Sequence, residues 1–226
     1  MPSFSVIVPV YNRVDFIGRC LESIASQDCI PEGDIEILVV DDGSTDGTQT
    51  AILEFMRKCN KQLVKYEPIK HVGEPGTVRN VALTMAQGEF LGYCDSDDVW
   101  LPHHLATAKQ AFKKYPSMGM VSNYWGLAQF VVVRGPNGTR IINNIVVPPH
   151  PTWAVNTNCR VHRRECVSKV GMFNTSKWGE DGDFFGRIEK AYPTLKTGIV
   201  TSINGYIKGG NNLSFQFDKG IKGRYF

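Results

Sequence analysis

Short apolar segments and amphipathic segments alternate through the first 98 residues, and this alternation constrains the fold more than any other feature. The apolar segments are rich in β-branched side chains, which is typical of strands covered on both faces. We expect strands at residues 4–10, 35–40, 63–66 and 90–94. Apolar residues at helical spacing predict helices within residues 14–24, 51–59 and 78–85. Such alternation predicts an α/β fold with a Rossmann-like, doubly wound and mostly parallel sheet.

A polar cluster follows three of the four expected strands. The clusters are residues 9–13, 41–46 and 95–98. The carboxyl ends of parallel strands meet at one edge of a sheet, and ligands of doubly wound sheets bind beyond that edge. The sequence therefore predicts one binding site that all three clusters share. Within the first cluster, Asn12 is also suited to capping the helix that follows it.

The composition is that of a folded globular domain. A length of 226 residues with 42% apolar residues suits one compact domain and excludes a disordered chain. No apolar run approaches the ~20 residues that a membrane-spanning helix needs. Met1 leads directly into the first expected strand without the features of a signal peptide, so we expect a cytoplasmic location. The cysteines show no Cys-x-x-Cys spacing, which argues against a zinc site.

The formal net charge of +3 conceals two halves of opposite sign. Residues 1–98 carry a net charge of −8, whereas residues 99–226 carry +11. The basic half invites interpretation as a nucleic-acid binder, but its lysines and arginines are scattered and no aromatic stacking motif accompanies them. We therefore expect no nucleic-acid partner. The basic half leaves open an interaction with a diphosphate, an anionic acceptor or a membrane surface.

The acidic cluster after the fourth expected strand is suited to binding a divalent cation. Asp95 and Asp97 are two residues apart, so their side chains point the same way in an extended segment. A hard cation such as Mg²⁺ or Mn²⁺ relieves the repulsion between such carboxylates and takes further ligands from substrate phosphates. The alternative is a solvated acidic turn before the helix that follows Pro102. Neither a glycine-rich dinucleotide fingerprint nor a P-loop is present to hold a phosphate instead.

The other polar segments also have two interpretations each. Asp41 and Asp42 either stabilise a turn or accept hydrogen bonds from a nucleobase or a ribose. Gly76 permits a close approach of the backbone. Arg79 is suited to pairing with a phosphate or with a carboxylate of the site. Sequence spacing leaves these alternatives open.

Four segments, in this order, resemble the family-2 glycosyltransferases of GT-A fold. They are residues 5–12 (SVIVPVYN), 39–48 (VVDDGSTDGT), 76–80 (GTVRN) and 95–98 (DSDD). The resemblance implies a single GT-A catalytic domain over residues 1–226, with a nucleotide-sugar-binding half at 1–98 and an acceptor-binding half at 99–226. It also implies a smaller acceptor-side sheet that abuts the main sheet.

The same resemblance implies roles for individual residues. Pro9, Tyr11 and Asp41 would surround the base of a nucleotide-sugar, usually a UDP-sugar. Asp95 and Asp97 would form the Asp-x-Asp motif that binds Mn²⁺ or Mg²⁺, while Asp98 is open to a role with the metal or the sugar. The remaining donor contacts are expected at Asn12, Arg13, Asp42, Gly76, Arg79, Asp95, Ser96 and Lys208. Family members often carry a histidine near this last position; residues 206–214 contain none, so a third protein ligand for the metal is left open.

The second half has a less regular pattern. Residues 127–133 and 140–147 flank the turn sequence Gly-Pro-Asn-Gly, which predicts a hairpin that could form a flap near the acceptor. Helices are expected around residues 104–112 and 164–170, with extended chain at 152–161.

Glu180 and Asp181 begin a further helical pattern and are the candidate catalytic carboxylates. Acidic residues interact favourably with a helix N-terminus, so capping is the alternative interpretation. A sugar hydroxyl is a weak nucleophile, and a carboxylate that accepts its proton assists direct displacement. The stretch resembles the Glu-Asp motif of the same family, which implies Asp181 as the general base and Glu180 as the fallback base or an acceptor-binding residue.

These observations together predict a metal-dependent, inverting glycosyltransferase that moves a sugar from a nucleotide-sugar to a hydroxyl of a glycan or other glycoconjugate. Inversion is implied by the resemblance. One alternative is a nucleotidyltransferase that makes nucleotide-sugars, although such enzymes typically have a glycine-rich basic loop where this chain has residues 9–13. The other alternative is a non-catalytic module that binds a sugar or a nucleotide.

Overall fold

The computed structural model describes residues 1–60, 62–135, 138–147, 156–175 and 179–207. Strands and helices alternate through the first half. Their order is β1 (Phe4–Val10), α1 (Ile17–Ala25), β2 (Ile35–Asp41), α2 (Thr48–Lys58), β3 (Leu63–Pro68), α3 (Pro75–Met85) and β4 (Phe90–Tyr93). The four strands and three helices predicted for this half are therefore confirmed.

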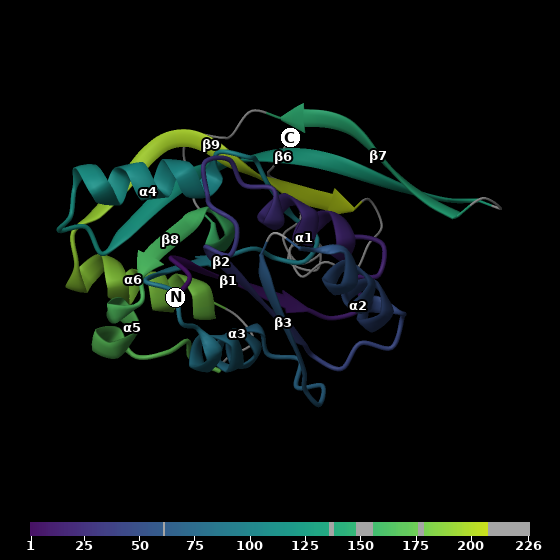
Figure 1. Cartoon of the computed structure of the whole chain (residues 1–226), viewed down its shortest axis with the longest axis horizontal. Helices are drawn as coiled ribbons and strands as arrows, with labels where there is room; N and C mark the ends of the chain where they lie inside the picture. The colour runs from purple at the N-terminus through teal and green to yellow at the C-terminus, as the bar shows by residue number, and fades with distance from the viewer. Residues whose placement is uncertain (61, 136–137, 148–155, 176–178, 208–226) are drawn as a thin grey trace, which may run out of the picture.

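The second half is less regular, as its sequence indicates. It contains β5 (Val99–Trp100), α4 (His104–Lys114), β6 (Met120–Gly135), β7 (Gly138–Val147), η1 (Thr157–Cys159), β8 (Arg160–Arg163), α5 (Glu165–Val170), α6 (Glu180–Ala191) and β9 (Thr194–Ile207). β6 and β7 form the predicted hairpin, which Figure 1 shows as a long ribbon. Within the segment expected to be extended, residues 152–155 lie outside the described residues and 157–159 form a 3-10 turn instead.

The strands join into one sheet, in the order β3-β2-β1-β4-β8-β6-β9-β5, with β7 paired to β6. β1, β2, β3 and β4 are mutually parallel. The chain moves outward from β1 to β3 and then returns to β4 on the other side of β1. Such a reversal leaves a crevice at the carboxyl ends of the two central strands, where ligands bind. The switch point between β1 and β4 therefore marks the expected site.

The strands of the second half extend this sheet beyond β4. β8 pairs antiparallel with both β4 and β6, so it connects the two halves. β9 then runs parallel to β6, and its far end pairs with the short strand β5. The α/β class is confirmed, whereas the smaller sheet expected to abut the main sheet is continuous with it, because β8 pairs with both β4 and β6.

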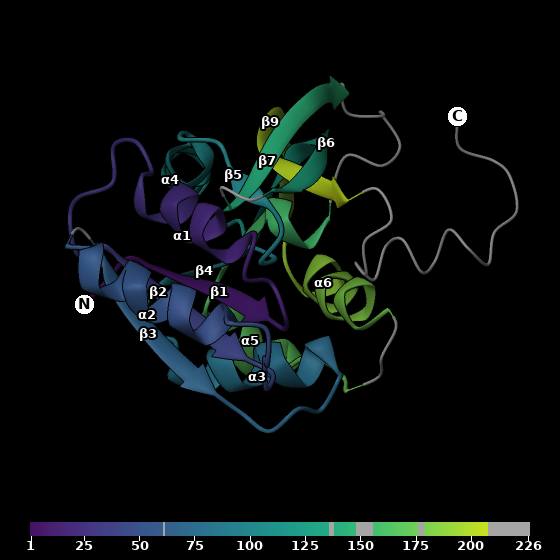
Figure 2. The ribbon, with the colours of Figure 1, turned by 90° about the vertical axis from the view of Figure 1, so that its right-hand side faces the viewer.

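Helices cover both faces of the sheet, which is the doubly wound arrangement (Figure 2). α1, α2 and α4 pack on one face, around a core that includes Val6 and Ile37. α3, α5 and α6 pack on the other face, where Phe184 and Phe185 join Ile7 and Leu38. Because successive strand residues point to opposite faces, each central strand contributes to both cores.

The first helix begins later than predicted. α1 starts at Ile17, and Phe16 precedes it without a side-chain hydrogen bond, so the prediction that Asn12 caps this helix is wrong. Asn12 instead has a φ of 50°, in the left-handed region that asparagine tolerates better than most residues. The side chain of Asn12 accepts a hydrogen bond from the Thr45 backbone N–H in the loop after β2.

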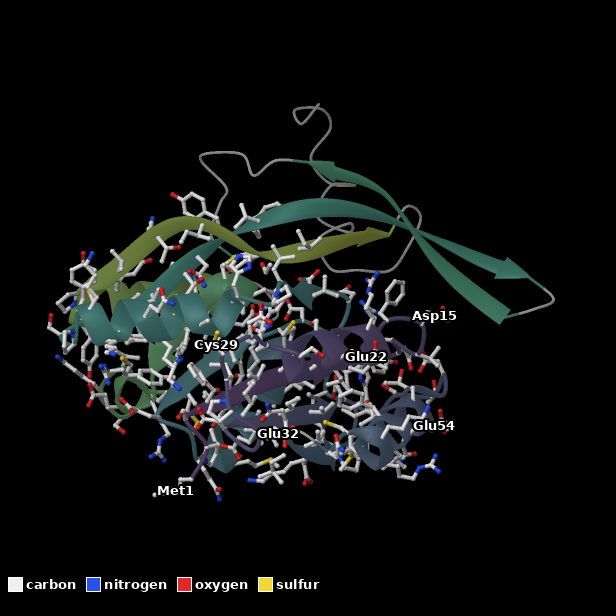
Figure 3. The ribbon with its side chains drawn as sticks, turned by 45° about the horizontal axis from the view of Figure 1, so that its top comes forward. Met1, Asp15, Glu22, Cys29, Glu32 and Glu54 are labelled. Atoms are coloured by element: carbon white, nitrogen blue, oxygen red, sulfur yellow. The ribbon has the colours of Figure 1, made fainter. Side chains whose placement is uncertain are left out.

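Negative charge gathers on the outer surface of the first half. Glu22, Glu32 and Glu54 are exposed, and Figure 3 shows their side chains around α1 and α2. These residues add to the negative net charge of this half without belonging to the polar clusters at the strand ends. In the part of the chain that the structure describes, no helix has the length and apolar character needed to cross a membrane.

Two fully buried histidines make the fold sensitive to acid. Burial lowers the pKa of His104 to about 3 and that of His162 to about 4. His162 is neutral between the Tyr93 hydroxyl, 2.7 Å from its Nε2, and the Arg163 carbonyl. The ring of His104 stacks on Trp100 with centroids 4.0 Å apart. Both pKa values lie below the ~6.5 of an unfolded histidine, so the unfolded state binds more protons below that pH.

The free energy of unfolding is therefore expected to fall as the pH drops from 7.5 to 5, by about 4 kcal/mol for the two histidines together. Urea unfolding at the two pH values measures this loss. His104→Gln should remove about half of the pH dependence, because His104 is one of the two buried histidines that contribute to it. A free energy that does not change between the two pH values would contradict the burial of neutral histidines.

Candidate active site

The three polar clusters meet at the switch point, as the sequence predicts. Residues 9–13 follow the end of β1, residues 41–46 follow β2 and residues 95–98 follow β4. The N-termini of α3 and α6 lie beside them, because Arg79 in α3 contacts both Asp95 and Glu180. Lys208, the remaining predicted donor contact, lies outside the described residues.

Asp41 and Asn12 tie the loops after β1 and β2 together. Asp41 is buried; its Oδ1 accepts a hydrogen bond from the Ser44 backbone N–H, and its Oδ2 accepts one from the Tyr66 hydroxyl at 2.9 Å. Asn12 donates its backbone N–H to the Ser44 hydroxyl and accepts the Thr45 N–H at its Oδ1, 2.8 Å away. The left-handed turn at Asn12 is what lets it bridge the two loops rather than cap α1.

Asp42 holds the loop that leads into α3. Its two carboxylate oxygens accept the backbone N–H groups of Val72 and Gly73 at 2.7 and 2.9 Å. His71 Nδ1 lies 2.9 Å from Asp42 Oδ2, and the His71 ring stacks on Tyr11 with centroids 4.2 Å apart. Tyr11 is 41% exposed, so one aromatic surface of the site is open to solvent. His71 is a site residue that sequence reasoning missed, since no motif marks it.

The acidic cluster is only partly neutralised by its neighbours. Arg13 Nε lies 3.4 Å from Asp97 Oδ2. Burial, and then the nearby charge of Asp95, raise the pKa of Asp97 despite that arginine. Asp98 is buried and accepts a hydrogen bond from the Asn158 side chain, while Ser96 is also buried. Asp95 and Asp97 are therefore the carboxylates of this cluster that face the crevice in part.

Arg79 joins the two candidate carboxylate motifs. Its Nη1 donates to Glu180 Oε1 at 2.8 Å, and its Nη2 donates to Asp95 Oδ1 at 3.0 Å. The Arg79 side chain is 6% exposed; burial by itself lowers the pKa of Arg79, but the two carboxylates outweigh burial and raise it. The sequence left open whether Arg79 pairs with a phosphate or with a carboxylate of the site. In the structure it pairs with two carboxylates, those of Glu180 and Asp95. The buried arginine thus fixes the β4 end against the start of α6.

Close packing at the N-terminus of α3 completes this connection. A Cβ on Gly76 would lie 2.2 Å from the Asn174 carbonyl oxygen and 3.2 Å from Glu180 Cγ, so only glycine fits there. One turn later, the Asn80 side-chain amide exchanges two 2.9 Å hydrogen bonds with the backbone of Phe173. The close approach predicted for Gly76 is therefore to the protein's own backbone.

Asp181 lies in the first turn of α6, where it is freer than Glu180. Thr157 in η1 donates its hydroxyl to Asp181 Oδ2 at 2.8 Å. Glu180 is 7% exposed and is held by Arg79. Asp181 is only partly buried. The second oxygen of Asp181, Oδ1, accepts the Gly182 backbone N–H at 2.7 Å, so of the two carboxylates Asp181 is the more exposed and the one that forms no ion pair with Arg79.

The donor set of the crevice fits a divalent cation that shares its coordination with a substrate. Asp95 and Asp97 supply hard oxygen atoms in a partly buried setting, as Mg²⁺ and Mn²⁺ prefer. Among the described residues, no group of three or more histidine, cysteine or acidic side chains gathers as a complete metal cage. A cation there would take its remaining ligands from phosphate oxygens and water.

Comparison with known proteins supports a single family. Residues 5–138 match glycosyl transferase family 2. The poly(ribitol-phosphate) beta-N-acetylglucosaminyltransferase TarS of Staphylococcus aureus is 45% identical over 98 residues, which make up 43% of this chain and 17% of TarS. The uncharacterized glycosyltransferase alr2836 of Nostoc sp. is 26% identical over 236 residues, covering 97% of this chain and 71% of that protein. The chain thus spans only part of the length of these relatives.

Solved structures show the same fold. TarS residues 1–349 in complex with UDP-GlcNAc superpose with a TM-score of 0.71 at 27% identity, covering 93% of this chain and 60% of that one. The mannosyltransferase PcManGT from Pyrobaculum calidifontis, in complex with GDP-Man and Mn²⁺, superposes with a TM-score of 0.72 at 21% identity, covering 96% and 60%. The predicted GT-A fold is confirmed by these two superpositions.

Proposed function

The chain belongs to glycosyl transferase family 2, and we propose that it moves a sugar, with inversion, from a UDP-sugar to a hydroxyl of a glycan or glycoconjugate acceptor. One observation carries the proposal: buried Arg79 joins Asp95, at the donor edge of the sheet, to Glu180, which precedes the candidate base Asp181. A donor-binding motif and a proton acceptor therefore share one crevice, which is what a direct displacement needs.

The donor would lie along the carboxyl ends of β1, β2 and β4. Tyr11 offers an aromatic face to the base, while Pro9 and Asp41 flank it at the ends of β1 and β2. The solved TarS structures with UDP and UDP-GlcNAc support a uridine nucleotide as the donor class. Because Asp41 already accepts two hydrogen bonds, its position is fixed before the donor binds.

Asp95 and Asp97 would hold the divalent cation, Mn²⁺ or Mg²⁺, that the diphosphate requires in so acidic a crevice. When bound, such a cation stabilises the negative charge that develops on the departing nucleotide. Arg13 and Arg79 each hold one oxygen of these carboxylates and so fix their orientation. Without added positive charge, a diphosphate would be repelled by this cluster.

Asp181 would act as the general base. It accepts the proton of the acceptor hydroxyl as that oxygen attacks the anomeric carbon from the face opposite the nucleotide. Thr157 donates its hydroxyl to Asp181 Oδ2 and the Gly182 backbone N–H donates to Oδ1 at 2.7 Å, so both oxygens of the proposed base are held in place by the protein. An α-linked D-sugar donor would then give a β-linked product, because the displacement occurs in one step.

Replacement of Asp97 with asparagine is expected to lower Mn²⁺-dependent release of UDP from a UDP-sugar by at least about 100-fold, because metal-ion charge stabilisation contributes several kcal/mol. The assay measures UDP released from a panel of UDP-sugars, with and without Mn²⁺. Asp28→Asn removes a carboxylate from the exposed surface and should behave like the wild type. Equal activity of the Asp97 variant and the wild type would refute the metal assignment.

A nucleotidyltransferase and a non-catalytic binding module are the two rival functions. A nucleotidyltransferase would release pyrophosphate from a nucleoside triphosphate. A binding module would bind the donor but show no turnover with any acceptor. The position of Asp181 beside the crevice favours transfer, since a binding module needs no proton acceptor there.

A further inference from the structure

Arg160 is a cation near the candidate base that forms no ion pair within 4.0 Å with a carboxylate of the described residues. It begins β8, directly after the η1 turn that carries Thr157. Val161 packs into the core on the α1 face, so Arg160 and His162 point to the α6 face. There the guanidinium of Arg160 lies over the Phe185 ring, with its Cζ 4.5 Å from the ring centroid. The Arg160 side chain therefore lies between β8 and α6, against the helix that carries Asp181.

The described surroundings of Arg160 leave its hydrogen-bonding capacity partly unused. Its Nε is buried without a hydrogen-bond acceptor, and no ion pair joins it to a carboxylate in the described part of the chain. Burial lowers the pKa of Arg160, which means that the charged form is poorly solvated there. By contrast, five other arginines among the described residues each lie within 4.0 Å of a carboxylate, namely Arg13, Arg57, Arg79, Arg163 and Arg187.

The face of α6 that lies against Arg160 carries two acidic residues, and these determine which ligands Arg160 is suited to bind. Asp181, Phe185 and Glu189 are spaced four residues apart, so they form one stripe along α6. The negative charges of Glu189 and Asp181 act on Arg160 from the two ends of this stripe. An anionic acceptor approaching Asp181 would meet repulsion from both carboxylates. Only a cation held between them offsets that repulsion.

We propose that Arg160 binds a phosphate group of the acceptor, next to the hydroxyl whose proton Asp181 accepts. This inference rests on the proposed function and names the acceptor class as a phosphate-bearing polyol or glycan. The planar guanidinium presents several N–H donors and pairs with phosphate in a bidentate manner. The net charge of +11 in residues 99–226 favours the same class, because a polyanionic acceptor is drawn to a basic surface.

The test measures binding of small probes by isothermal titration calorimetry at saturating UDP and Mn²⁺, so that the diphosphate position is filled. Glycerol 3-phosphate is compared with glycerol and with inorganic phosphate. We expect glycerol 3-phosphate to bind the wild type more tightly than either of the others. Arg160→Gln should weaken that binding about tenfold or more. The affinity of Arg160→Lys should lie between those of the wild type and Arg160→Gln, because lysine keeps the positive charge but cannot form the bidentate hydrogen bonds of a guanidinium.

Arg164→Gln is the matched control, since Arg164 carries the same charge four residues along and is exposed. It should bind glycerol 3-phosphate like the wild type. Equal binding by the wild type and Arg160→Gln, or inorganic phosphate binding as tightly as glycerol 3-phosphate, would overturn the proposal. A lowered melting temperature in Arg160→Gln with unchanged preference for the phosphorylated probe would also overturn it, as a purely structural role. Binding of UDP to the wild type is measured separately and tests the proposed function. If the wild type does not bind UDP, the proposed function is refuted, whatever the result for Arg160.

Discussion

Asp181→Asn is expected to abolish most sugar transfer while leaving the fold and the affinity for UDP intact. Removing a general base costs about 10²–10⁴-fold in rate. Asparagine has the same shape, and its side-chain oxygen can accept the hydroxyl of Thr157 as the Asp181 carboxylate does at 2.8 Å. The side chain stays in place, but it can no longer accept the proton of the acceptor hydroxyl.

Steady-state transfer and UDP binding should be measured on the same preparations of this variant. Glu180→Gln is the informative comparison, because Glu180 is the neighbouring carboxylate but is already held by Arg79. If Glu180→Gln stops transfer and Asp181→Asn does not, the two roles are reversed. Thr157→Val, which removes only the hydrogen bond that orients Asp181, should lower the rate by a smaller factor.

Arg79→Met is expected to lower the free energy of unfolding by about 3–5 kcal/mol, the usual cost of leaving a buried carboxylate without its partner. Arg79 is 5% exposed and Glu180 is 7% exposed, so water cannot replace the lost ion pair. Asp95 contributes less to this loss, because its side chain is 36% exposed. Urea unfolding measures the change directly.

A double mutant separates the buried charge from the packing around it. In Arg79→Met with Glu180→Gln, the buried carboxylate that had lost its partner is itself removed, so part of the lost stability should return. Arg79→Lys should be intermediate, since a lysine ammonium cannot reach Glu180 and Asp95 with the same fork geometry. A loss below about 1 kcal/mol in Arg79→Met would show that the bridge is not a buried ion pair.

The order of strands and helices in the first half was predictable because each element has a local signal. β1 and β2 are apolar runs, and the apolar residues of the helix between them, α1, recur at helical spacing. The position of the site was predictable from the same pattern, since polar clusters lie at the carboxyl ends of several parallel strands. β9 was not predictable in this way. Its 14 residues, interrupted by Gly198 in a left-handed conformation, are held by pairing with β6, which lies far away in the sequence.

Individual side chains were harder to predict, because their partners come from distant segments. Asn12 has the residue type of a helix cap, but it binds the loop after β2. Asp42 has the residue type of a turn or a ligand contact, and the structure commits both of its oxygens to the loop before α3. His71 and Arg160 belong to no motif, and only the fold places them beside Tyr11 and Phe185.

The central claim is that this crevice transfers a sugar from a nucleotide-sugar, and identification of the released nucleotide tests it most directly. The protein is incubated with Mn²⁺ and either a panel of UDP-sugars or UTP with a sugar 1-phosphate, and the nucleotide and phosphate products are separated by chromatography. We predict UDP from at least one UDP-sugar of the panel and no pyrophosphate from UTP. Pyrophosphate from UTP, without UDP from any nucleotide-sugar, would contradict the account.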